Sequence, residues 1–230
     1  VRFSNIYNNY TNFTDIGWRD ALKYKLGSRF SFRGNIISDR YETLSMNDVF
    51  ANLAASSEWL TIDELQKFAE EMGTPIYFDP VYENAIRVDN NLFVSKAQAH
   101  FQVEETDAIL DRFCTGQYIP IIAVNEFVNF PYVGFPWTSF LLESYVAFYS
   151  KKYKLLHGGY NLTRAVGAIV KKNAGYDNFD DLLVDVLTRS NIPLEKRSAL
   201  ELLVQDGYIA RRSYQKIEEL LIRATAKRNK

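Results

Sequence analysis

The stretch from residue 45 to residue 95 carries the clearest secondary-structure signals in this chain. Apolar residues recur at helical spacing after Ser45, which predicts a first helix that reaches Trp59. The sequence Thr61-Ile-Asp-Glu64 is a capping box, in which the Thr hydroxyl accepts an amide of the first turn and the Glu carboxylate returns to the Thr amide. We therefore expect a second helix that starts at Thr61 and ends at Gly73, because glycine is the usual residue at a helix C-terminus.

A strand-turn-strand pattern follows this second helix. Ala85–Val88 and Leu92–Val94 are mostly apolar, and the Asp-Asn-Asn sequence between them suits a tight turn, because Asn and Asp tolerate positive φ. Two helices followed by a hairpin resemble the outline of winged helix-turn-helix domains. The recognition helix would then lie within Thr74–Asn84, where two prolines leave room for little more than one turn.

The charge of this middle region is wrong for contact with DNA. Residues 44–115 carry thirteen Asp and Glu against four Lys and Arg, and no Lys or Arg occurs from Phe68 to Ile86. A helix that enters the major groove needs cations for the phosphates and Arg, Lys, Asn or Gln for the bases. We expect the region to bind protein or to serve as a scaffold, and the candidate protein-binding residues are Glu70, Glu71, Glu104 and Glu105. The alternative is that these glutamates are only solvated helix faces.

Eleven of the 36 residues from Tyr118 to Tyr153 are aromatic, a much higher fraction than the 15% of the whole chain. Prolines divide it into a predicted helix over residues 121–130, a rigid turn, and a second predicted helix over residues 138–151. One interpretation is an aromatic core that joins the two halves of the chain. The other is an apolar groove for a partner helix or for stacked bases, which requires several rings to be exposed together.

The last third of the chain is basic and has helical periodicity throughout. Residues 151–230 carry sixteen Lys and Arg against nine Asp and Glu, and helices are predicted over 160–172 and from about residues 177, 193 and 213. A basic face could follow the phosphates of a nucleic acid. Its candidate residues are Lys171, Lys172, Arg211, Arg212, Lys216, Arg223, Lys227 and Arg228. The alternative is that these cations only complement the negative ends of helix dipoles.

These signals predict an α+β fold that is mainly helical, with a winged-helix-like segment and its β-hairpin followed by a C-terminal helical bundle. The predicted parts are an N-terminal α+β region (1–115) with the winged-helix-like segment at 45–95, an aromatic-rich helical junction (116–153) and a basic helical bundle (154–230).

Sequence motifs for catalysis are missing. The chain has no Walker A, GxGxxG, HExxH, GxSxG or CxxC sequence. Its single cysteine, Cys114, and its two histidines cannot by themselves build a zinc site. We therefore expect no cofactor, no bound metal and no enzymatic activity. An enzyme with a site of dispersed carboxylates, or one built around His157, is kept as an alternative.

The sequence thus predicts a non-catalytic binding module. Its acidic middle would contact a protein partner or neighbouring domains of the same polypeptide, with DNA or RNA as a further candidate partner of the basic C-terminal helices. A purely structural protein-protein interaction domain is the first alternative. No apolar run approaches the roughly 20 residues that cross a bilayer, so we expect a cytoplasmic, intracellular protein that does not contact membranes. Because the first residue is Val, we expect the chain to be a fragment of a multidomain protein.

Overall fold

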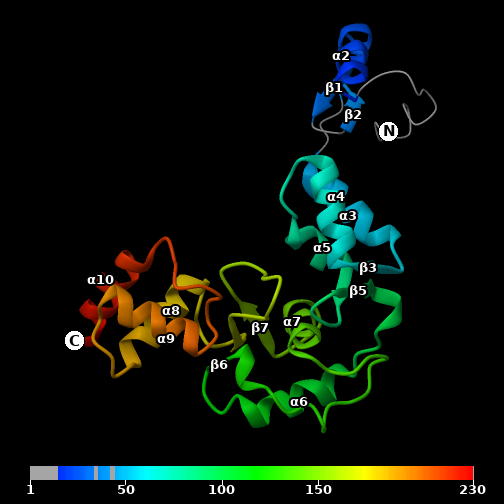
Figure 1. Ribbon diagram of the computed structural model, residues 1–230. Coiled ribbons are helices and arrows are strands. Elements are labelled where there is room, and N and C mark those ends of the chain that lie inside the picture. The colour runs from blue at the N-terminus through cyan, green and yellow to red at the C-terminus, as the bar shows by residue number, and fades with distance from the viewer. Residues whose placement is uncertain (1–14, 34–35, 42–44, 230) are drawn as a thin grey trace. The chain divides into compact units, whose positions relative to one another are not determined.

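The computed structural model describes residues 15–33, 36–41 and 45–229 (Figure 1). These residues form helices and small antiparallel sheets. The protein is therefore α+β and mainly helical, as the sequence predicts. None of the helices in the described ranges is long and apolar enough to span a bilayer.

Contacts within the chain divide it into two compact units, residues 1–84 and residues 85–230. The two predicted domain boundaries, after residues 115 and 153, both lie within the second unit. The segment predicted to resemble a winged helix starts in the first unit and ends in the second.

In its described residues, the first unit has one helix and two antiparallel strands, followed by three further helices. Its elements are α2 (Asp15–Leu26), β1 (Phe30–Arg33), β2 (Ile36–Asp39), α3 (Met46–Ser56), β3 (Trp59–Thr61), α4 (Ile62–Met72) and α5 (Phe78–Asn84). The predicted capping box is present at the start of α4, and Gly73 ends the helix in the left-handed conformation with φ of 66°. The second predicted helix is thus confirmed. The first is present but ends at Ser56, short of the predicted Trp59, which lies in strand β3.

Helix α5 is short, as the two prolines of its region require. Pro80 lies in its first turn, where a missing backbone N–H breaks no helical hydrogen bond. Val81 and Tyr82 on α5 are fully buried, and so are Phe50 on α3 and Leu65 on α4. These side chains form the interior of the first unit.

The second unit consists of a hairpin, a small sheet and a bundle of helices. Its elements are β4 (Ala85–Arg87), β5 (Leu92–Ser95), the 3-10 turn η1 (Lys96–Gln98), α6 (Val103–Phe113), β6 (Tyr118–Pro120), the 3-10 turn η2 (Ile121–Ala123), α7 (Ser139–Phe148), β7 (Tyr153–Leu156), β8 (Ala168–Lys171), α8 (Phe179–Arg189), α9 (Lys196–Gln205) and α10 (Ile217–Arg228). Strands β4 and β5 are antiparallel with Ile86 opposite Val94, which confirms the predicted hairpin.

Strands β7 and β8 correct the prediction that residues 154–230 are entirely helical. Strand β8 lies at the centre of the antiparallel sheet β6-β8-β7. The predicted helix over residues 160–172 is wrong, because the run from Ala165 to Val170 is buried throughout and such a run suits a central strand as well as a helix. Gly167 within it has φ of 114°, which no helix contains.

Helices α8, α9 and α10 form the predicted C-terminal bundle and lie side by side in Figure 1. Leu183 and Leu187 of α8, Leu203 of α9 and Leu220 of α10 are fully buried in one cluster. The apolar stripes read from the sequence are therefore the contact faces of these helices.

The aromatic-rich stretch has less helix than predicted. The predicted helix over residues 121–130 is wrong, since these residues form only η2 and irregular turns. At their start the backbone N–H of Ile121 donates to the carbonyl of Gly167 at 3.0 Å, which continues the pairing of β6 with β8. Helix α7 confirms the second predicted helix of this stretch. Phe130 and Tyr145 are buried, and the Trp137 ring centroid lies 4.9 Å from that of Phe130. Most of these rings thus belong to a core, as the first interpretation holds.

A buried arginine ties the hairpin to a distant loop within the second unit. Arg87 is 0% exposed, and its guanidinium donates hydrogen bonds to the carbonyls of Asn90, Asn161 and Leu162 at 2.8, 2.7 and 2.6 Å. Its charged carbon lies 3.9 Å from the centroid of the Phe140 ring. Because the fork of an arginine can bind several carbonyls at once, one side chain holds the loop after β7 against the hairpin.

Candidate functional site

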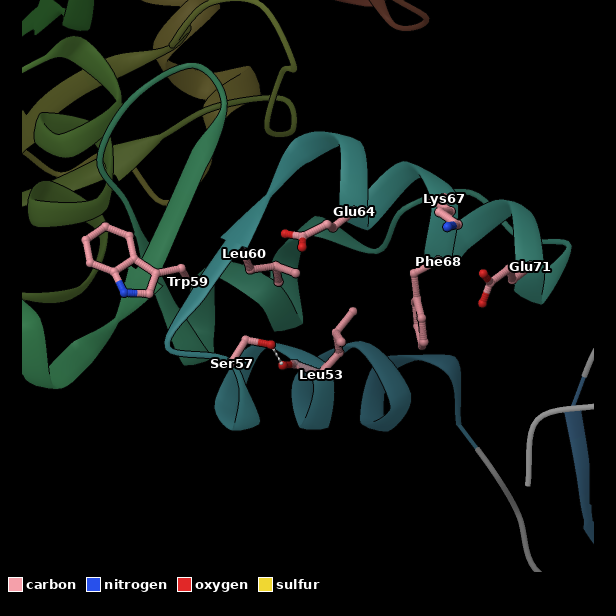
Figure 2. A pocket seen from close by; sticks show the side chains of 8 residues that line it. All are labelled: Leu53, Ser57, Trp59, Leu60, Glu64, Lys67, Phe68 and Glu71. Atoms are coloured by element: carbon pink, nitrogen blue, oxygen red, sulfur yellow. Dashed lines mark hydrogen bonds between the residues drawn. The ribbon is translucent and has the colours of Figure 1, made fainter. Parts of the chain in front are cut away.

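A groove in the first unit lies between α3 and α4 (Figure 2). Its volume is about 270 Å³, and it is lined by Leu53, Ser57, Trp59, Leu60, Glu64, Lys67, Phe68 and Glu71. Figure 2 shows Leu53 on α3 and Phe68 on α4 extending into the space between the two helices, with Glu71 at one end of the groove and Trp59 at the other, its ring directed away from Phe68. The groove therefore has apolar walls and charged residues along its edge.

The indole of Trp59 is the most exposed apolar side chain of this groove. The residue is 50% exposed, although tryptophan is a highly buried residue type on average. The wall formed by Phe68 is held in place by the interior of the unit, because the rings of Phe68 and the buried Phe50 meet edge to face with centroids 5.4 Å apart. The groove thus combines one accessible aromatic ring at its end with one fixed ring in its wall.

The capping box positions the acidic edge of the groove. The backbone N–H of Thr61 donates to the Glu64 carboxylate at 2.8 Å, and the N–H of Glu64 donates to the Thr61 hydroxyl at 3.2 Å. Hydrogen bonds from the backbone and the hydroxyl of Thr61 lower the pKa of Glu64 below its ordinary value of 4.5. A negative charge is therefore retained at this edge.

The groove lies in a strongly acidic part of the chain. From Ser45 to Asn84 the sequence has eight Asp and Glu residues and one cation, Lys67. Of the predicted protein-binding residues, Glu70 is exposed on α4 and Glu71 lines the groove. The surroundings of the groove thus favour a positively charged ligand.

The other two predicted protein-binding residues lie on α6, in the second unit. Glu104 pairs with Lys151 at 2.5 Å, and the hydrogen bond from this ammonium lowers the pKa of Glu104. Glu105 is exposed in the first turn of the same helix. The four predicted glutamates are therefore divided between the two units.

A second hollow, in the second unit, is lined by lysines. Its volume is about 300 Å³, and its lining residues are Asp111, Lys151, Lys152, Tyr153, Lys171, Lys172 and Asn173. Lys152 pairs with Asp111 at 2.6 Å. Two of the predicted nucleic-acid-binding residues, Lys171 and Lys172, therefore lie beside two lysines from the turn before β7.

A buried carboxylate fixes the backbone of that turn. Asp107 on α6 is 1% exposed, and each of the backbone N–H groups of Lys151 and Lys152 donates to it at 3.0 Å. The hydroxyl of Tyr145 donates to it at 2.8 Å and that of Ser150 at 2.6 Å. The positions of the two lysines at the hollow are thus set by a charge-assisted network.

Three of the predicted basic residues on the C-terminal helices are bound to α8. Lys216 pairs with Asp180 at 2.6 Å, and Arg223 pairs with Asp181. Arg228 donates to the carbonyls of Leu187 and Ser190 at 2.6 and 2.7 Å, at the C-terminus of that helix. Within the bundle these side chains have structural partners.

The remaining predicted basic residues differ in their surroundings. Arg212 lies 3.9 Å from Glu201, and Lys227 is exposed on the last turn of α10. Arg211 is exposed and lines a third hollow of about 230 Å³ beside Gly158 and Gly159.

The groups that the sequence leaves as candidates for catalysis are the carboxylates and His157. Nowhere in the described parts of the chain do three or more His, Cys, Asp or Glu side chains gather as a metal would require. The Nδ1 atom of His157 accepts a hydrogen bond from the Gly159 N–H at 3.2 Å. Cys114 is buried, and this burial raises the pKa of its thiol.

Sequence reasoning missed Asp107 and Trp59 as site residues. Asp107 follows Val103 by four residues and precedes Leu110 by three, so it falls on the apolar face of its helix. A carboxylate on such a face needs partners and could have been identified by that rule. For Trp59 the sequence contains no comparable signal, because a tryptophan between two apolar helices is ordinarily buried.

No family model matches this chain, and no curated protein or solved structure matches it.

Proposed function

We propose that this chain is a non-catalytic binding module of a larger protein or assembly. The groove of the first unit would bind an amphipathic helix of a partner protein, with Lys or Arg residues beside its apolar face. The observation that carries the proposal is the half-exposed Trp59 at the end of the groove whose apolar walls are formed by Leu53 and Phe68. Exposed tryptophans in apolar grooves are frequent centres of binding energy.

Charge supports the choice of a basic partner. With eight acidic residues to one lysine between Ser45 and Asn84, the region attracts cations and repels acidic partners. The apolar walls would bind the partner's leucines or aromatic residues, and Glu64 and Glu71 would meet its lysines at the edge. Complementary charge mainly speeds association and selects the partner.

The order of elements supports a winged-helix arrangement for residues 45–95. Along the chain, α3, β3, α4, α5, β4 and β5 follow one another as helix, strand, two helices and a hairpin. In this arrangement α5 takes the place of the recognition helix. Its sequence holds Asp79 and Glu83 and no cation, so the proposed target of the module is a protein and not DNA.

Peptide binding tests the proposal. The probe is a synthetic amphipathic helix with a leucine stripe flanked by lysines, and the control peptide has glutamates in place of those lysines. Calorimetry should detect binding of the lysine peptide and no binding of the glutamate peptide. Trp59→Ala and Glu71→Lys should each weaken that binding by about tenfold or more, which is about 1.4 kcal/mol.

Matched variants separate the groove from general surface effects. Tyr24, which is 92% exposed on α2, is the control for the aromatic side chain, and Glu105 on α6 is the control for charge. Tyr24→Ala and Glu105→Lys should bind the lysine peptide as the parent does. Equal binding by the parent and by both groove variants would rule out the groove as the docking site.

A further inference from the structure

We infer that the lysine-lined hollow of the second unit is a phosphate site that binds the backbone of a nucleic acid without regard to base sequence. This moves the nucleic-acid contact expected from the sequence away from helices α8–α10 and to one end of strands β7 and β8. It is independent of the groove proposed for the partner protein.

Four lysines line this hollow because two strand ends meet there. Lys171 is opposite Tyr153 in the pairing of β8 with β7, and the backbone N–H of Lys172 donates to the carbonyl of Lys152 at 2.9 Å. The lysines before β7 and after β8 are therefore neighbours across the sheet edge. Each strand of duplex DNA carries one phosphate for about every 3.4 Å of helix axis, so more than one phosphate can meet this group of lysines at once.

The hollow keeps a positive balance after its ion pairs are counted. Lys151 and Lys152 pair with Glu104 and Asp111. Within the described residues, no carboxylate lies at ion-pair distance from Lys171 or Lys172, although the Lys172 ammonium donates to the Ser150 carbonyl at 2.8 Å. The Lys151–Glu104 pair is 71% and 79% exposed, and pairs of this kind contribute little, so a phosphate can replace the carboxylate.

The lining favours a nucleic-acid backbone over bases and over a membrane. Its single aromatic residue, Tyr153, is fully buried, and its hydroxyl donates to Asp111 at 2.7 Å. It therefore offers no exposed ring on which a base could stack. The remaining lining side chains are polar or charged, whereas a membrane-binding site presents apolar side chains beside its cations.

Fluorescence anisotropy of the full chain with short DNA tests the inference. We expect duplexes of unrelated sequence to bind equally, and affinity to fall as salt rises. The double variant Lys171→Gln/Lys172→Gln should weaken binding by roughly tenfold or more at low salt and reduce the slope of log K against log salt by about 1.8, the contribution of two phosphate contacts. The matched control, Lys216→Gln/Lys227→Gln, removes two cations from the C-terminal helices and should bind as the parent does.

A variant that binds more tightly provides a second test, because a variant that fails to fold would not gain affinity. Glu104→Gln removes the partner of Lys151 and should tighten binding by roughly threefold to tenfold. Thermal unfolding of each variant verifies the fold. The inference is overturned if no nucleic acid binds at low salt, or if the Lys171/Lys172 variant binds as the parent does. It is also overturned if only inorganic phosphate or phosphatidylserine vesicles bind.

Discussion

The carboxylate of Asp107 accepts a hydrogen bond of 2.6 Å from the hydroxyl of Ser150, which lies 43 residues later in the chain. The same carboxylate accepts the backbone N–H groups of Lys151 and Lys152. One buried side chain on α6 therefore determines where the turn before β7 runs.

Asp107→Asn should reduce the free energy of unfolding by about 2–4 kcal/mol. The variant loses the charge that strengthens four hydrogen bonds. Its new NH₂ group is a donor, and the groups that surround it are also donors, so it finds no acceptor. Urea unfolding followed by circular dichroism measures the change. Asp177→Asn, at an exposed carboxylate of the same unit, should be neutral, and a similar loss in both variants would contradict the role given to Asp107.

The capping box of α4 should make the stability of the first unit depend on pH. Hydrogen bonds from Thr61 lower the pKa of Glu64 in the folded state, so the folded chain binds this proton less readily than the unfolded chain does. The stabilisation is therefore complete above the ordinary value of 4.5 and is lost as the pH falls through the lowered pKa.

Glu64→Gln and Thr61→Ala test this dependence. Thr61→Ala should lower stability at neutral pH by about 0.5–2 kcal/mol, the usual contribution of an N-cap residue. Glu64→Gln should lower it by less, because the amide oxygen can still accept the Thr61 N–H. Both should also flatten the fall in unfolding free energy between neutral and acidic pH. If the unfolding free energies of the parent and the variants changed with pH in parallel, the protonation of Glu64 would not be linked to folding, and the prediction would be wrong.

Gly167→Ala should destabilise the second unit by about 2 kcal/mol or more. Gly167 has φ of 114°, and an added Cβ atom would lie 2.6 Å from the carbonyl oxygen of Leu156. Both the backbone conformation and this contact oppose a side chain. Gly116→Ala is the matched control, because its nearest neighbour would be the Tyr118 carbonyl oxygen at 3.9 Å. Equal melting temperatures for the two variants would contradict the prediction.

Arg228 and Lys227 are adjacent but should respond differently to substitution. Arg228→Ala should reduce stability by about 1–2 kcal/mol, since it removes hydrogen bonds to carbonyls at the C-terminus of α8. Lys227→Ala, at an exposed position, should change stability by less than about 0.5 kcal/mol. Denaturant titration of both variants measures the difference. If Arg228→Ala were as stable as the parent, Arg228 would not act as a cap of α8.

The parts of the fold that the sequence predicts correctly have local signals. The start of α4 at Thr61 and its end at Gly73 depend on hydrogen bonds within one helical turn. The hairpin of β4 and β5 likewise depends on a short polar turn between two apolar segments. Such signals act between residues a few positions apart, so they can be read without knowledge of the rest of the chain.

The run from Ala165 to Val170 shows where local reading fails. A fully apolar run can be a buried helix or a central strand, and the choice depends on what lies on both sides of it. Here Ile119 of β6 and Leu155 of β7 both pair with Ile169. These partners are 50 and 14 residues away along the chain, and their approach could not be read from the run itself.

For the candidate sites, too, some properties follow from the sequence alone and others depend on tertiary contacts. The acidity of the middle region and the excess of cations after residue 150 are properties of the sequence alone, because they are sums over residues. Which cations remain available was decided by the tertiary structure. Lys216 and Arg223 were placed against the carboxylates of α8, whereas Lys171 and Lys172 were placed beside Lys151 and Lys152. Charge is carried by each residue, but its neutralisation requires a partner within about 4 Å, and only folding brings distant residues to that distance.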